Sequence, residues 1–133
     1  MCKTIKHKVT FSAPPATIYS WLSDGKKHSL LTGESAVISK VLGGRFSVCN
    51  GKVTGINVDL KPGQRIVQAW RAKDFPPEAF SMATFLLRET SRGGTELTLI
   101  HRGVPKEFIH RTEAHWKKRY WEPLKVKVEE PYL

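Results

Sequence analysis

The stretch that decides the fold is PKEFIHRTEAHWKKRYWEPLK, residues 105–125, near the end of the 133-residue chain. Turning by about 100° per residue, an α-helix over this stretch gathers its large apolar side chains into one stripe, about a third of the circumference wide. The stripe contains Phe108, Ile109, Thr112, Trp116 and Tyr120. This pattern predicts a long helix with one side buried in the core of the domain.

The other side of this helix is basic. Four cations lie outside the apolar stripe: Arg111, Lys117, Lys118 and Lys125. Two residues break the division, because Arg119 projects inside the stripe and Trp121 projects beside the lysines. Pro123 removes the backbone hydrogen bond to the carbonyl of Arg119, so we expect the helix to kink or end there.

Most of the preceding chain has the two-residue alternation of half-buried β-strands. Residues 4–11 alternate in this way, and Ser12, two prolines and Gly25 then delimit a short helix, with a second helical turn expected at residues 26–33. Further strands are predicted at residues 35–42, 45–49, 52–60, 65–72, 81–90 and 95–104. Asn50-Gly51 predicts a two-residue hairpin turn, and Gly55 indicates a bulge or a close backbone approach.

The predicted order is one strand, one or two short helices, about six antiparallel strands and one long helix. This order predicts an α+β fold in a single domain of residues 1–133, with a core of about 4–125 and a tail at 126–133. A chain of this length is sufficient for one hydrophobic core.

Composition narrows the classes of function. No apolar run approaches the ~20 residues of a membrane span, and the N-terminus lacks the apolar centre of a secretory signal, so we expect a cytoplasmic protein with Cys2 and Cys49 as reduced thiols. The formal net charge of +10 favours an acidic partner. Because the positive charge is spread along the chain, a nucleic-acid-binding arm is not expected.

No catalytic residue, metal site or cofactor is predicted. His110 and His115 are five residues apart, a poor spacing for two ligands on one helical face. The sequence contains no nucleophile-elbow motif and no glycine-rich phosphate loop between a strand and a helix. We therefore expect a binding module rather than an enzyme.

The ordered series of motifs resembles the family named for the activator of the Hsp90 ATPase, within the START-like, helix-grip superfamily. The resemblance covers residues 10–125 and is closest to the C-terminal domain of the eukaryotic co-chaperone. It rests on residues 43–46, Gly51, Gly55, Leu60, Pro62, 66–67, 70–71, 95–97, 103–105, Trp116, Tyr120 and Trp121.

The resemblance implies a bent antiparallel sheet of six or seven strands wrapped around the C-terminal helix. It also implies a non-catalytic protein that binds an Hsp90-type chaperone and stimulates its ATPase. The sequence departs from the family at His115, where a glycine is frequent, and the resemblance is to one of the co-chaperone's two domains only. The wider superfamily implies an alternative, a carrier or sensor of a small apolar ligand held under the helix.

Two sets of residues are candidates for binding. For a partner protein, Trp121 is the anchor, with Lys117, Lys118, Lys125 and Arg111 around it; the alternative is that Trp121 packs on the first helix near Trp21. For a small ligand, a cavity of roughly 300 Å³ or more is expected, or else its lining residues simply fill the core. That lining comprises Phe46, Trp70, Phe85, Trp116, Tyr120 and Arg119.

Arg119 has three interpretations, because a cation inside an apolar stripe must be paired or reach water. It can orient an anionic ligand, pair with a carboxylate such as Glu89 or Glu96, or extend to solvent at the end of the helix.

Overall fold

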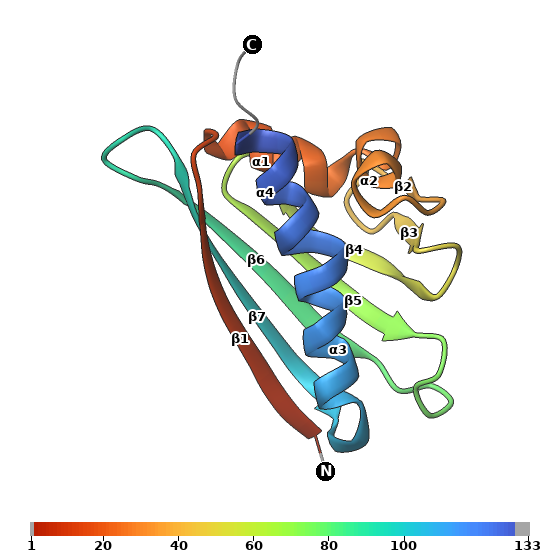
Figure 1. The fold of residues 1–133 in the computed structure, drawn as a ribbon. Helices are drawn as coiled ribbons and strands as arrows, with labels where there is room; N and C mark the ends of the chain where they lie inside the picture. The colour runs from red at the N-terminus through yellow and green to blue at the C-terminus, as the bar shows by residue number, and fades with distance from the viewer. Residues whose placement is uncertain (1, 130–133) are drawn as a thin grey trace.

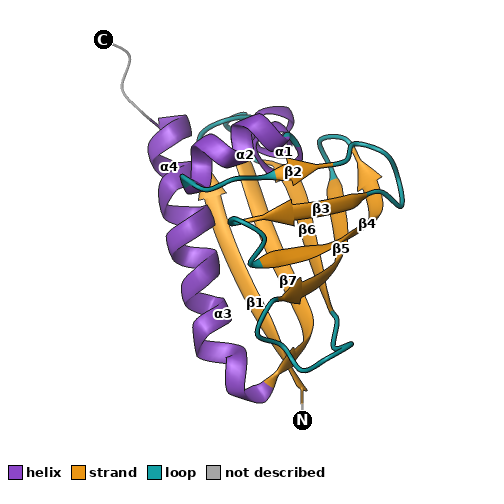
Figure 2. Ribbon diagram, turned by 90° about the vertical axis from the view of Figure 1, so that its right-hand side faces the viewer, coloured by secondary structure: helices purple, strands orange, loops and turns teal. Residues whose placement is uncertain are grey.

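One antiparallel sheet of seven strands organises the chain, and its spatial order is β1-β7-β6-β5-β4-β3-β2. The structure, a computed structural model, describes residues 2–129. The sheet bends around the C-terminal helix (Figures 1 and 2). Its strands are β1 (Cys2–Phe11), β2 (Val37–Ile38), β3 (Arg45–Val48), β4 (Val53–Lys61), β5 (Arg65–Ala72), β6 (Ser81–Glu89) and β7 (Thr95–Pro105).

Two short helices follow the first strand and cover one end of the sheet (Figure 1). They are α1 (Pro15–Ser23) and α2 (Gly25–Thr32), separated by Asp24, whose side chain accepts a hydrogen bond from the backbone N–H of Lys27. The C-terminal helix has four consecutive segments and lies along one face of the sheet (Figure 2). They are η1 (Lys106–Phe108), α3 (Ile109–His115), η2 (Trp116–Trp121) and α4 (Glu122–Glu129).

The core lies between the sheet and this helix. Every second residue of the strands faces the helix, which buries Phe46, Trp70 and Phe85 opposite Trp116 and Tyr120. The predicted fold is confirmed: the chain is α+β, with a bent antiparallel sheet, a long C-terminal helix and short helices after the first strand. The predicted apolar stripe is confirmed too, since Thr112, Trp116 and Tyr120 are buried while Phe108 and Ile109 pack against the core.

The helix itself differs from the prediction at its centre. Trp116–Trp121 forms a π-helical turn, in which the N–H of Glu122 donates to the carbonyl of Lys117, five residues earlier. A π-turn turns by less per residue than an α-helix, so Trp121 moves toward the sheet instead of lying about 140° from Trp116. The prediction of an exposed Trp121 is wrong, because its exposed fraction is only 6%.

The helix continues beyond Pro123. Pro123 is the second residue of α4, which continues to Glu129, so the predicted end at Lys125 is too early. The π-turn directly before Pro123 shifts the backbone hydrogen bonds by one residue, which accommodates a residue without an N–H. Residues 126–129 of the predicted tail are therefore helical, and residues 130–133 lie outside the described part.

One turn and one strand also differ from the expectation. The hairpin at Asn50-Gly51 has a four-residue connection, Cys49–Lys52, between the paired residues Val48 and Val53. Cys49 and Asn50 both have positive φ, 54° and 57°, an uncommon conformation for residues other than glycine. The expected strand over residues 35–42 is reduced to Val37–Ile38.

Gly55 marks a close approach, as predicted. A Cβ atom there would overlap the carbonyl oxygen of Ala69 and lie 2.7 Å from the ring of Phe46. The irregular register of β4 lies elsewhere, between Asn57 and Asp59. In residues 2–129, no helix is both long enough and apolar enough to cross a membrane.

Candidate functional site

Two tryptophans of the π-turn donate hydrogen bonds to histidines of two adjacent strands. The indole Nε1 of Trp116 donates to Nδ1 of His101 on β7 over 3.1 Å, and that of Trp121 donates to Nδ1 of His7 on β1 over 2.9 Å. The two indole rings stack with centroids 5.9 Å apart. Trp121 therefore packs on β1 and Trp116, rather than on the first helix as the alternative had it.

The bond from Trp116 fixes the tautomer of His101. Because Nδ1 accepts, the ring proton lies on Nε2, which donates to Ser81 Oγ over 2.7 Å. Ser81 in turn donates to the carbonyl of Trp70 over 2.8 Å. A proton on Nδ1 would place two donors face to face, so this chain of bonds requires a neutral imidazole.

Three histidines are held neutral: His28 and His101, which are buried in the core, and His115 on α3, which is half-buried. Burial lowers the pKa of His101 to about 3, with a smaller contribution from repulsion by His115 when that ring is protonated. Burial also lowers the pKa of His28 and of His115 to about 4. Burial raises the pKa of the Cys49 thiol to about 11 and that of the Tyr120 hydroxyl well above 10. None of these groups is a nucleophile or a base poised near neutral pH.

A cleft of about 350 Å³ opens beneath α3, between that helix and the ends of β4 and β5. Trp70 Nε1 and His115 Nε2 are buried atoms without a hydrogen-bond partner within residues 2–129, and both residues line the cleft. Unpaired buried polar atoms are unfavourable, so a ligand that bonds to them would gain free energy. The lining comprises Lys52, Val53, Trp70, Ala72, Lys73, Asp74, Arg111, Thr112 and His115.

The expected cavity lining is only partly brought together here. Trp70 lines the cleft, whereas Phe46, Phe85, Trp116 and Tyr120 are buried among their neighbours in the core. Those four residues fill the core, which is the alternative that the sequence left open for them. Arg111, expected on the partner-binding face, lines the cleft instead and pairs with Asp74 over 3.1 Å.

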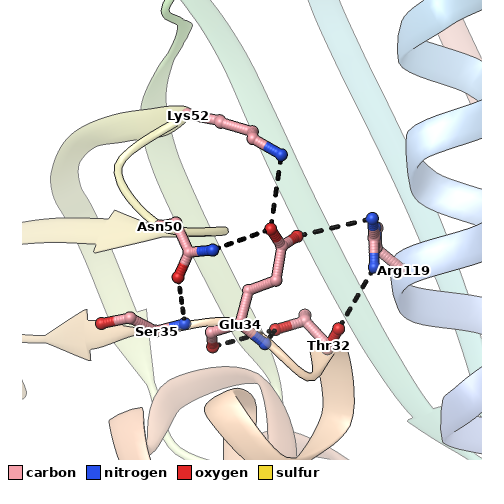
Figure 3. Close-up of polar contacts among 6 residues, drawn as sticks. All are labelled: Thr32, Glu34, Ser35, Asn50, Lys52 and Arg119. Carbon is pink, nitrogen blue, oxygen red and sulfur yellow. Dashed lines mark hydrogen bonds and ion pairs between the residues drawn. The ribbon is translucent and has the colours of Figure 1, made fainter.

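Arg119 is paired with a carboxylate that the sequence did not single out. Its Nη2 lies 3.6 Å from Oε1 of Glu34, and its Nη1 donates to the carbonyl of Thr32 over 3.3 Å (Figure 3). The expected partners Glu89 and Glu96 are not involved, and Glu96 pairs with Arg88. Arg119 also reaches solvent, since 44% of its side chain is exposed.

Glu34 is the hub of a polar network joining three segments of the chain. Its Oε2 accepts from Nδ2 of Asn50 over 3.0 Å and from Nζ of Lys52 over 3.3 Å (Figure 3). Asn50 Oδ1 also accepts from the backbone N–H of Ser35 over 2.7 Å. The loop after α2, the β3–β4 hairpin and the helix are thereby connected at the side of the domain where Lys52 borders the cleft.

Sequence reasoning missed Glu34, His7 and His101. Glu34 lies in an irregular segment where alternation gives no orientation. His7 and His101 lie on the inward faces of their strands, each two residues from a buried apolar residue, Ile5 and Leu99 respectively. That position was a signal that they meet the helix.

The solvent side of the helix keeps its predicted basic character. Lys117, Lys118 and Lys125 are exposed, and none of the three forms an ion pair within the described residues. We call these three lysines the helix basic face. Buried Trp121 is not an anchor on it.

The neutral histidines predict a stability that falls in mild acid. Their pKa values in the folded protein lie below the ordinary value of about 6.5, so the unfolded chain binds more protons as the pH falls below 6.5. Each histidine then lowers the free energy of unfolding by about 1.4 kcal/mol per pH unit. Urea unfolding between pH 7 and pH 5 measures this loss, and His115→Gln should remove about a third of it.

The matched control is His110→Gln, because His110 is an exposed histidine on the same helix. It controls for the loss of a histidine at an exposed position of this helix. Equal slopes for the wild type and His115→Gln would contradict a buried neutral His115.

Comparison with known proteins identifies a family that matches this chain. Residues 12–129 match the model of the family described as Activator of Hsp90 ATPase homolog 1-like protein. A human protein named activator of 90 kDa heat shock protein ATPase homolog 1 is 32% identical over 93% of this chain, which covers 36% of the human protein. A Dictyostelium discoideum activator homologue is 28% identical over 92% of the chain, covering 32% of that protein.

The chain thus spans about a third of the length of these curated relatives. A solved structure with the same fold is an HSP90 activator from Plasmodium falciparum, at a TM-score of 0.86, with 21% identity and 98% of both chains covered. With the family model matching most of the chain, the protein belongs to the Activator of Hsp90 ATPase homolog 1-like family.

Proposed function

We propose that this protein is a non-catalytic, cytoplasmic co-chaperone module that binds an Hsp90-type chaperone and stimulates its ATPase. Membership of the activator family carries the proposal. The chemistry of the interior supports it, because the buried histidines, Cys49 and Tyr120 are neutral and paired with or packed against other core residues. Stimulation then comes from binding to and stabilising the closed chaperone, with no chemistry on this chain.

The helix basic face supplies the attraction to the partner in this proposal. Lys117, Lys118 and Lys125 are exposed and unpaired within the described residues, and the chain carries a net charge of +10. Charges of this kind accelerate association with an acidic surface and make it sensitive to salt.

The double variant Lys117→Glu/Lys118→Glu tests the proposal. At low salt it should weaken chaperone binding about tenfold, mainly by slowing association, and should lower ATPase stimulation at subsaturating concentrations. Surface plasmon resonance and a coupled ATPase assay at two salt concentrations measure both effects.

Lys26→Glu/Lys61→Glu is the matched control, since it changes the net charge equally at two exposed lysines that lie on α2 and β4. No stimulation by the wild-type protein would contradict the proposed function. Equal effects of the two double variants would contradict only the role of the helix basic face.

A second candidate function is the binding of a small amphipathic ligand, and the cleft beneath α3 favours it. A volume of about 350 Å³ is within the usual range for ligand sites. The apolar walls include Trp70 and Ala72, while Lys52 and Lys73 border the cleft. This composition fits an apolar body with an acidic group.

Ala72→Trp should separate the two functions by filling the cleft. With 8-anilinonaphthalene-1-sulfonate as the probe, the wild type should show saturable fluorescence enhancement that Ala72→Trp abolishes. Stimulation of the chaperone ATPase should persist in this variant. Unchanged probe binding would show that the cleft is not the ligand site.

A further inference from the structure

A cross-strand row of side chains runs over the face of the sheet that points away from the helix. The strand registers align Arg45 with Ile56, Ile56 with Ala69, Ala69 with Met82, and Met82 with Arg102. Each alternates with inward-facing neighbours such as Phe46, Trp70 and Ala83. We call these five residues the outer row: three apolar side chains with an arginine at each end.

The outer row is accessible. Ile56 and Met82 are 40% and 39% exposed, and the long helix lies on the other side of the sheet (Figure 2). A groove of about 520 Å³ runs beside Arg45 and Ile56 and is lined by the neighbouring residues Val37 and Phe80. Exposed apolar side chains that cluster on a basic protein are typical of a surface that binds another molecule.

The aromatic side chain at this groove follows a loop that is held by hydrogen bonds to Arg71. The guanidinium of Arg71 donates to the carbonyls of Phe75, Pro76 and Ala79, at 3.1, 2.6 and 3.1 Å. These bonds hold the loop although Glu78 adopts a φ of 64°. Phe80, at the end of the loop, is 54% exposed. Phe80 therefore adds a large exposed apolar side chain to this groove, directly after a hydrogen-bonded loop.

The charges at the ends of the row indicate the chemistry of the partner. Within residues 2–129, neither Arg45 nor Arg102 forms an ion pair. Four strand spacings of ~4.8 Å separate them by about 19 Å. Two carboxylates at that separation, with apolar side chains between them, would complement the row.

Two other occupants fit less well. A second copy of this chain would bring arginines against arginines across a symmetric contact and add to the repulsion of a net charge of +10 on each copy. Nucleic acid binds sheets through several stacked aromatic side chains, whereas the apolar members of the row are Ile56, Ala69 and Met82.

We propose that the outer row, with Phe80, is a docking surface for a protein segment that carries apolar side chains between two acidic groups. The inference rests on the proposed function only for the identity of that protein, the Hsp90-type chaperone. It assigns docking to the sheet, whereas the helix basic face supplies long-range attraction.

Two double variants test it from independent directions. Ile56→Glu/Met82→Glu changes the apolar centre, and Arg45→Glu/Arg102→Glu reverses the charged ends. Each should weaken chaperone binding by about tenfold or more in calorimetry. The matched control is Leu30→Glu/Val126→Glu, which places glutamates at apolar residues that are 68% and 60% exposed on α2 and α4. Thermal unfolding checks that each variant is folded, and the charge-reversed variant keeps the apolar centre intact.

Amide chemical shifts in NMR identify the residues at which the chaperone binds. With ¹⁵N-labelled wild type, chaperone addition should shift the amides of the outer row and Phe80. If the chaperone binds but both row variants equal the control, the docking surface is wrong and the proposed function stands. If the chaperone does not bind at all, the proposed function fails.

A model peptide decides the docking proposal without the chaperone. The probe is a helical peptide with a leucine face and glutamates about 19 Å apart, and its counterpart has lysines in their place. The glutamate peptide should shift the row amides and the lysine peptide should not. No shift at millimolar peptide, dimerisation of the wild type through the row, or displacement of the peptide by oligouridylate would each overturn the proposal.

Discussion

The structure depends on one constraint: both tryptophans of the C-terminal helix must reach histidines on two adjacent strands. His101 lies on β7 and His7 on β1, and each accepts a hydrogen bond from an indole. Trp116 and Trp121 are five residues apart, which a regular α-helix places on different sides. The π-turn brings both onto the sheet, and this need gives a physical reason for the irregular segment in the middle of the helix.

Several other features follow from that arrangement. Because Trp116 donates to Nδ1 of His101, the imidazole must stay neutral, and the chain of bonds continues through Ser81 to the backbone of β5. Because Trp121 points inward, the solvent side of the helix carries the lysines of the helix basic face. The interior is therefore occupied by the contacts of the fold, and the binding sites that we propose are the helix basic face, the cleft beneath α3 and the outer row.

The strands and the buried stripe of the helix could be predicted from the sequence, because alternation and the 100° period report burial directly. Trp121 could not be placed, since the same period assumes a regular helix. The one local signal was Pro123, which the sequence suggested as a kink or an end and which the π-turn accommodates.

The polar contacts of the site were less accessible to sequence reasoning. Glu34 and Arg119 are far apart along the chain and meet only because α2 and the helix pack side by side. The outer row could not be predicted for a related reason. Its five members belong to five strands, and their alignment depends on the strand registers. The bulge between Asn57 and Asp59 shifts one of those registers, and the alternation of each strand read alone does not reveal the shift.

Hydrogen exchange of the indole N–H protons tests the central claim most directly. Proton NMR in deuterated water resolves the indole signals of the four tryptophans. The account predicts that the indole protons of Trp116 and Trp121 exchange slowly, because each is buried and hydrogen-bonded to a histidine, while that of half-buried Trp21 on α1 exchanges fast. Exchange of Trp121 as fast as that of Trp21 would contradict the π-turn and the two bonds on which this account of the fold rests.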